Sequence, residues 1–161
     1  MFIVDVIKKE DARGELKLIY KMIERSLGFV PPHFELFATI DIQAMKKFAA
    51  YNQKMAIHES IDKNLLPHLR LAIAKKECRN YCVSFNTKML ETKEFEIDER
   101  QKLLMSKVLK SLNETELFRR DDIEELKTVG FTDKDFFDLL NYATNFMAKS
   151  KMIEVYLKQK T

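Results

Sequence analysis

The sequence predicts an all-α protein, a bundle of about seven to eight helices, and three observations support this. The chain has 161 residues, of which 46% are hydrophobic, enough for the core of one ordinary domain. It contains only three glycines and three prolines, too few for the many tight turns of an all-β fold. Hydrophobic residues recur at spacings of three and four along most of the chain, which is the period of amphipathic helices.

Four helices are predicted in the first half of the chain, each bounded by a residue that favours a helix end. The first spans about residues 14–27, and Gly28 is suited to its C-cap. A short helix follows the proline pair of the next connection. Asp41 is suited to cap the third helix, and Asp62 the fourth.

Four more helices are predicted in the second half. The fifth follows a break near Asn80, because asparagine is a weak helix former. The fourth and fifth helices then form a central hairpin around a cysteine pair. Residues suited to start the later helices are Asp98, Asp121 with Glu124, and Thr132 with Asp135.

No linker or repeat divides the chain, so residues 1–161 are expected to form a single domain. Phe2, Val4 and Val6 alternate with their neighbours, a pattern that would suit an extended N-terminal arm over residues 1–10.

The charge pattern argues against binding to nucleic acid. The net charge is +3 on 53 charged side chains, and no basic run is longer than two residues. No apolar stretch approaches the roughly 20 residues that a membrane span requires. The apolar residues before Lys8 are too few for a signal peptide. We therefore expect a cytoplasmic protein without membrane or nucleic-acid partners.

Cys78 and Cys82 are the only cysteines and the only plausible chemical centre. On a regular helix, residues four apart have Cβ atoms about 5–6 Å apart. A disulfide needs roughly 3.5–4.5 Å between them. A regular helix would therefore forbid the bond, whereas a corner between the two cysteines would permit it.

A redox role for the pair is one interpretation. Cys82 would lie in the first turn of the fifth helix, where free N–H groups and the nearby Arg79 favour a thiolate. Such a thiolate attacks a peroxide, and the second cysteine converts the sulfenate to a disulfide. The alternative is that both cysteines are small buried hydrophobic residues. Two cysteines with scattered histidines do not make a zinc site, and no cofactor motif is present.

Five segments, in this order and spacing, resemble the alkylhydroperoxidase D-like / carboxymuconolactone decarboxylase superfamily, in its peroxidase-related branch. The resemblance covers about residues 14–157. The segments are Leu27-Gly28-Phe29-Val30-Pro31, Leu69-Arg70-Leu71-Ala72-Ile73-Ala74, Asn80-Tyr81-Cys82, Ile97-Asp98-Glu99-Arg100-Gln101 and Val129-Gly130-Phe131-Thr132-Asp133.

The resemblance implies an all-helical homo-oligomer and a thiol peroxidase site. In the peroxidase members a helix begins with C-x-x-C, and its second cysteine meets the peroxide. A glutamate before the pair and a histidine after it relay protons, and a lipoyl-type or similar dithiol partner supplies electrons.

This chain keeps only part of that motif. Cys82 matches the second cysteine, while Arg79 holds the first-cysteine position and Cys78 lies one place earlier. Asn86 holds the histidine position and cannot take a proton at neutral pH. Pro67 holds the glutamate position, and His68 beside it is a candidate substitute.

The resulting hypothesis is a peroxidase-like antioxidant or redox protein that acts through Cys82 with Cys78, helped by His68, Arg79 and Asn86. Two alternatives remain open. One is a catalytically lapsed member that serves as an oligomeric binding or scaffold protein. The other is a non-thiol enzyme of the carboxymuconolactone decarboxylase type.

Overall fold

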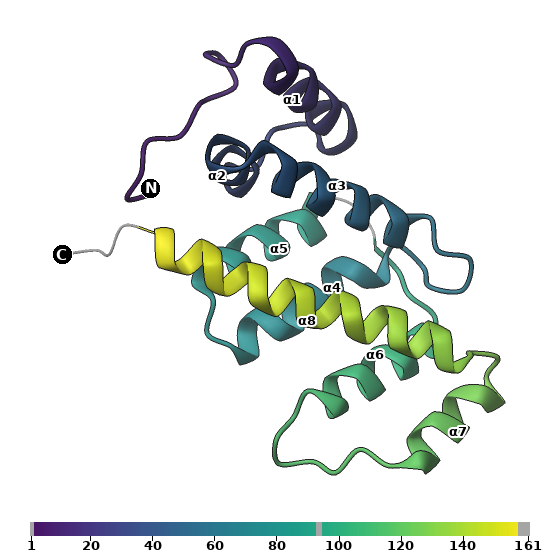
Figure 1. The fold of residues 1–161 in the computed structure, drawn as a ribbon. Coiled ribbons are helices and arrows are strands. Elements are labelled where there is room, and N and C mark those ends of the chain that lie inside the picture. The colour runs from purple at the N-terminus through teal and green to yellow at the C-terminus, as the bar shows by residue number, and fades with distance from the viewer. Residues whose placement is uncertain (1, 93–94, 158–161) are drawn as a thin grey trace. The chain divides into compact units, whose positions relative to one another are not determined.

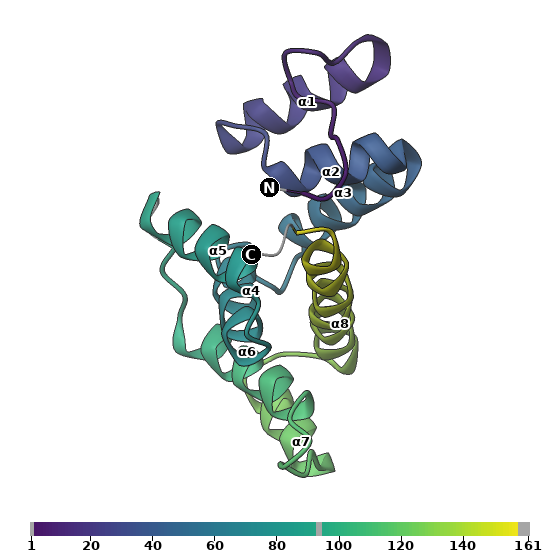
Figure 2. The same cartoon turned by 90° about the vertical axis from the view of Figure 1, so that its left-hand side faces the viewer.

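The computed structural model describes residues 2–92 and 95–157, and its regular elements are eight helices (Figures 1 and 2). Within these residues the only β feature is an isolated bridge between Phe2 and Leu157. The predicted all-α fold of seven to eight helices is confirmed. No helix in the described ranges is both long enough and apolar enough to cross a membrane.

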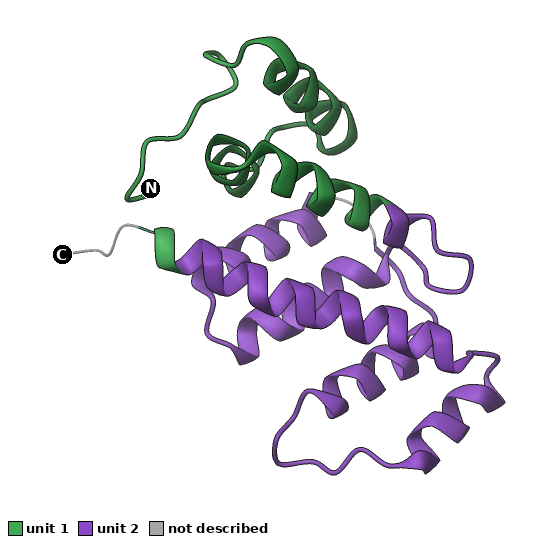
Figure 3. Cartoon of the chain, in the orientation of Figure 1, with its two compact units in different colours: residues 1–53, 155–161 green, residues 54–154 purple. Residues whose placement is uncertain are grey.

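The chain divides into two compact units (Figure 3). Unit 1 comprises the described parts of residues 1–53 and 155–161, and unit 2 those of residues 54–154. The single domain over residues 1–161 remains a prediction. Met1 of the predicted arm lies outside the described residues.

Unit 1 contains α1 (Gly14–Leu27), α2 (Pro32–Ile40) and most of α3 (Ile42–Ala56). The arm before α1 is tied to this unit by its backbone. The Ile7 amide donates to Thr39 Oγ1 at 2.8 Å, and the Tyr20 hydroxyl donates to the Ile7 carbonyl at 3.0 Å. The buried cluster at its centre consists of Ala12, Leu16, Tyr20, Ile23, Ala38 and Met45.

The helix ends predicted in unit 1 are confirmed. Gly28 adopts the left-handed conformation after α1, with a φ of 83°, and its amide donates to the Glu24 carbonyl. One carboxylate oxygen of Asp41 accepts hydrogen bonds from the Gln43 and Ala44 amides at the start of α3.

Unit 2 contains α4 (Leu65–Lys76), α5 (Asn80–Thr92), α6 (Glu99–Ser111), α7 (Arg120–Thr128) and α8 (Asp133–Tyr156), which ends in unit 1. The predicted hairpin is formed by α4 and α5, which pack on each other across a three-residue corner. The cysteine pair predicted within it is not confirmed, because Cys78 and Cys82 are free and not adjacent, one exposed and the other buried. In both views α7 lies beside α6 (Figures 1 and 2). Fully buried core residues of unit 2 include Leu65, Leu69, Ala74, Leu104, Val108, Leu139 and Ala143.

Two predicted caps in unit 2 are confirmed. Asp98 accepts a hydrogen bond from the Gln101 amide at 2.7 Å. Thr132 and Asp135 cap each other, because the Thr132 amide donates to the carboxylate and the Asp135 amide donates to the threonine hydroxyl oxygen.

The other two caps of unit 2 are not where the sequence pattern put them. Asp122, rather than Asp121 with Glu124, accepts the Arg119 amide at the start of α7. Asp62 accepts the amide of Asn64, the residue before α4, so it forms a turn rather than a helix cap. Short polar side chains two or three residues apart compete for the same amides, and the sequence pattern does not rank them.

Candidate functional site

The corner between α4 and α5 is a Schellman motif with a cysteine at its left-handed position. The Arg79 amide donates to the Ala74 carbonyl at 2.9 Å, and the Cys78 amide donates to the Lys75 carbonyl at 3.2 Å. Cys78 has a φ of 53°, a region in which glycine is the usual residue. The break predicted near Asn80 is therefore confirmed, and Cys78 is exposed at its apex.

Cys82 lies in the first turn of α5, as predicted, but its thiol is not activated there. The residue is only 4% exposed. Burial, and then the negative charge of Glu154, raise the pKa of the Cys82 thiol to about 11, against the opposing effects of Arg79 and Arg70. Arg79 favours the thiolate, as expected, but desolvation outweighs this effect, so the thiol is protonated at neutral pH.

Two glutamates share the guanidinium of Arg79 and partly compensate its charge. It forms an ion pair with Glu154 of α8 and a longer one, at 3.6 Å, with the neighbouring Glu77. Its Nε is buried and has no hydrogen-bond partner. Arg79 therefore fixes the corner against α8 and lowers the thiol pKa less than an unpaired cation would.

Asn86 is buried one helical turn after Cys82 on α5 and connects it to Arg70 of α4. Its amide nitrogen donates to the Cys82 carbonyl at 2.8 Å, and its amide oxygen accepts from Arg70 Nε at 2.8 Å. The same guanidinium donates through Nη1 to the hydroxyl of buried Tyr142 at 2.5 Å. The position that holds a histidine in the resembled family here holds a neutral link in a hydrogen-bond chain.

His68 contacts a backbone group instead of a thiol. Its Nε2 lies 2.6 Å from the Phe95 carbonyl oxygen, in the connection that precedes α6. Pro67 is buried in the first turn of α4, where proline is tolerated. Neither residue forms a contact with Cys78 or Cys82 in the hydrogen bonds described for this unit, so the helper role of His68 stays a prediction.

Sequence reasoning missed Arg70, Tyr142 and Glu154. Arg70 carried a usable signal, because it is the only Asp, Glu, Lys or Arg between residues 65 and 74. A lone charge on such an apolar helix usually has a specific partner. Tyr142 and Glu154 carried no comparable signal, because their approach depends on how α8 packs.

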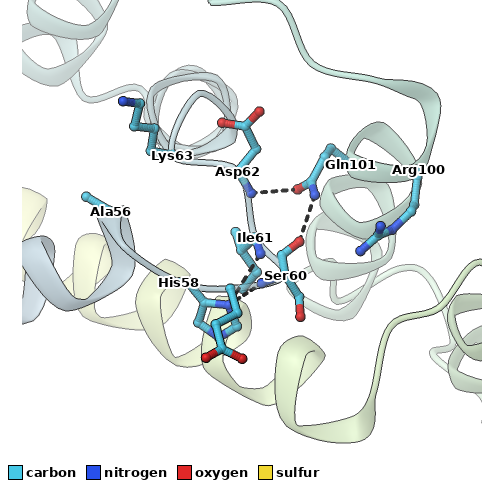
Figure 4. A pocket seen from close by; sticks show the side chains of 9 residues that line it. Ala56, His58, Ser60, Ile61, Asp62, Lys63, Arg100 and Gln101 are labelled. Atoms are coloured by element: carbon cyan, nitrogen blue, oxygen red, sulfur yellow. Dashed lines mark hydrogen bonds between the residues drawn. The ribbon is translucent and has the colours of Figure 1, made fainter.

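A separate shallow pocket of about 420 Å³ lies over the connection between α3 and α4 (Figure 4). His58 connects this segment to α8, because its Nε2 lies 3.2 Å from Asp138. Its Nδ1 accepts hydrogen bonds from the Ser60 and Ile61 amides. Gln101 of α6 binds the same segment: its side-chain oxygen accepts a hydrogen bond from the Asp62 amide, and its side-chain nitrogen donates to the Ser60 carbonyl (Figure 4). None of the site residues predicted from the sequence lines this pocket.

The described residues offer no metal site, since no three His, Cys, Asp or Glu side chains within residues 2–92 and 95–157 gather closely enough to hold an ion. The chemistry available at the corner comes from two free thiols, two arginines, a tyrosine and an amide.

No family model matches the sequence, and no curated protein does either. Solved structures do match. A peroxidase-related protein of Ralstonia eutropha, described as an alkylhydroperoxidase AhpD core, superposes with a TM-score of 0.75 at 20% identity, over 98% of this chain and 91% of that one. A peroxidase-related protein of Silicibacter superposes with a TM-score of 0.72 at 15% identity, over 98% and 88%. The fold predicted from the five sequence segments is confirmed: the chain has the fold of the alkylhydroperoxidase AhpD core.

Proposed function

We propose that this chain is a thiol-dependent, peroxidase-like redox protein that reduces hydroperoxides through Cys78 and Cys82. The observation that carries the proposal is the corner itself: an exposed cysteine at its apex precedes a second cysteine in the first turn of the next helix. The fold shared with peroxidase-related proteins supports it. The absence of a glutamate and histidine relay makes the expected turnover slow.

The two cysteines have different tasks in this proposal. Cys78 is exposed and meets the oxidant, whereas Cys82 is buried and has a pKa near 11. This reverses the order implied by the family resemblance, in which the residue matching Cys82 meets the peroxide. The reason is physical, because a thiolate that is both rare and buried cannot be the first nucleophile.

The proposed cycle balances with one hydroperoxide and one dithiol. The Cys78 thiolate attacks the terminal oxygen of the hydroperoxide, so that an S–O bond forms as the O–O bond breaks. The alkoxide leaves as the alcohol after taking the proton released from the Cys78 thiol, and Cys78 becomes a sulfenic acid. The Cys82 sulfur then attacks the Cys78 sulfur, the S–O bond breaks, and the hydroxide leaves as water after taking the proton of Cys82. A dithiol or lipoyl-type donor reduces the disulfide and is itself oxidised. We further propose that the protein works in the cytoplasm as a homo-oligomer.

Counting thiols after peroxide treatment tests this proposal. Reduced protein mixed with excess cumene hydroperoxide should lose both free thiols, and its intact mass should fall by two hydrogens. The chain has no other cysteine, so the readout is unambiguous. Cys82→Ser should give a sulfenic acid on Cys78 that dimedone traps, while Cys78→Ser should stay reduced. Two unreacted thiols in the native protein would refute the proposal.

A second candidate is a catalytically lapsed AhpD-like protein that acts as an oligomeric binding or scaffold protein. The observation that favours it is the burial of Cys82 together with the neutralisation of Arg79 by Glu154 and Glu77. It predicts that Cys82→Ser leaves assembly and every partner unchanged. Size-exclusion chromatography and partner capture with the native protein and this variant distinguish the two candidates.

A further inference from the structure

The two cations near the Cys82 thiol differ in how their charge is compensated. Arg79 forms ion pairs with Glu154 and Glu77. Arg70, on α4, has two side-chain partners, the Asn86 amide oxygen and the Tyr142 hydroxyl oxygen, and both are neutral. None of the ion pairs found in the described ranges involves Arg70.

A half-buried guanidinium without a carboxylate partner is uncommon, because charges withdrawn from water are usually paired. Here the guanidinium is fixed at two points, through Nε to α5 and through Nη1 to α8. Neutral acceptors hold it in place without cancelling its positive charge. This arrangement suits a group that is negatively charged only in some states of the protein, such as the Cys82 thiol.

We propose that Arg70 stabilises the thiolate of Cys82 together with Arg79, and that Asn86 and Tyr142 are positioning residues for the Arg70 guanidinium. In the resembled family a glutamate and a histidine support the thiolate by relaying protons. This chain lacks that relay, and the positive charge of Arg70 supports the thiolate instead. Its part in a redox cycle rests on the proposed function. The electrostatic coupling between Arg70 and Cys82 does not.

The coupling matters at the two steps in which Cys82 carries negative charge. When Cys82 attacks the Cys78 sulfenic acid, its thiol loses a proton as the S–S bond forms. When a donor thiolate attacks the Cys78 sulfur, the S–S bond breaks and Cys82 leaves as a thiolate. A fixed cation lowers the free energy of both charged states.

Every charged group packed near the thiol enters this balance. Burial and then Glu154 of α8 raise the pKa of Cys82, while Arg79 of the corner and, to a smaller degree, Arg70 of α4 lower it. Removing Arg70 leaves Glu154 opposed only by an arginine that already forms an ion pair with it. The loss should therefore exceed that from an exposed cation on the same helix.

The test uses Cys78→Ser protein, in which Cys82 is the only thiol, and follows its alkylation by a small neutral reagent across the alkaline range. Adding Arg70→Met should slow alkylation about tenfold at each pH below the midpoint, since loss of a nearby opposite charge moves a pKa by roughly one unit or more. Lys75→Met, which removes an exposed cation from the same helix, is the matched control and should change the rate less than about twofold. Arg70→Lys should restore most of the rate.

Tyr142→Phe keeps the charge and removes one of its anchors, so it should slow alkylation less than Arg70→Met does. Circular dichroism of each variant checks the fold, and if Arg70→Met does not fold, Tyr142→Phe and Arg70→Lys decide. Rates equal to or faster than those of the Cys78→Ser parent would overturn the role of Arg70. A different outcome separates the two proposals. If Arg70→Met shifts the pH profile of Cys82 alkylation but both thiols of the native protein fail to react with hydroperoxide, the proposed function is refuted and the coupling stands.

Discussion

Replacing Cys78 with glycine should stabilise the reduced protein, because the native conformation at this position is costly for any residue with a Cβ. Cys78 has a φ of 53° at the left-handed position of the corner. Its side chain is exposed, so the substitution removes little buried surface. The two hydrogen bonds of the motif use the amides of residues 78 and 79 and remain available to glycine.

The magnitude follows from two opposing terms. The left-handed conformation costs an L-residue roughly 1–2 kcal/mol, which glycine avoids. Glycine loses more backbone freedom on folding, and this offsets about 0.4–1 kcal/mol of the gain. We therefore expect a net stabilisation of about 0.5–1 kcal/mol, or about 1–4 °C in Tm for a protein of this size.

Urea denaturation in the presence of a reductant provides the assay. With an m-value near 2 kcal/mol/M, the midpoint of Cys78→Gly should rise by roughly 0.3–0.5 M without a change in slope. Cys78→Ala is the control, since alanine also lacks the thiol but keeps the strained Cβ. Equal midpoints for the glycine and alanine variants would show that the left-handed conformation carries no cost at this corner, and the explanation would fail.

Three further predictions concern other described groups. A thiol reagent at neutral pH should label Cys78 rapidly and Cys82 very slowly, because a pKa near 11 leaves about one Cys82 thiolate in ten thousand. Equal labelling of both cysteines in the native state would contradict the burial of Cys82. Burial and the charge of Glu35 raise the pKa of Tyr20 to about 12, so stability should fall as the pH rises from about 10 toward 12, and Tyr20→Phe should remove that fall in an alkaline unfolding series. Ion pairs with two lysines of α6 hold the pKa of Asp122 well below its usual range, so its stabilising effect, complete above about pH 4, should disappear as the pH falls further. Asp122→Asn should flatten the acid limb of the stability profile, and an unchanged limb would exclude this carboxylate as its source.

Most of the fold could be predicted from the sequence because its helix boundaries depend on local chemistry. The first helix was predicted over residues 14–27 and forms over that range, with Gly28 in the conformation expected of a C-cap. The pair formed by Thr132 and Asp135 has the predicted reciprocal hydrogen bonds. The start of α7 was misplaced because three acidic residues lie within four positions of one another, and tertiary ion pairs choose Asp122 among them.

The site was predictable in position and less so in chemistry. Periodicity put Cys82 in the first turn of a helix, which is where it lies. Whether that turn activates the thiol depends on burial and on Glu154, which is 72 positions away in the sequence. The contacts of Arg70 were likewise not predictable, because its two partners come from α5 and α8 and no local pattern connects the three residues.

The joining of both chain ends within unit 1 has a consequence for synthesis on the ribosome. The Ile3 amide donates to the Tyr156 carbonyl at 2.8 Å, and buried Phe2 forms its bridge with Leu157. The first helices emerge early, yet the segment after residue 154 that completes their unit is translated only after all of unit 2, which is one continuous segment. We therefore expect a released chain truncated after residue 154 to protect unit 2 from proteolysis while its N-terminal arm is cleaved.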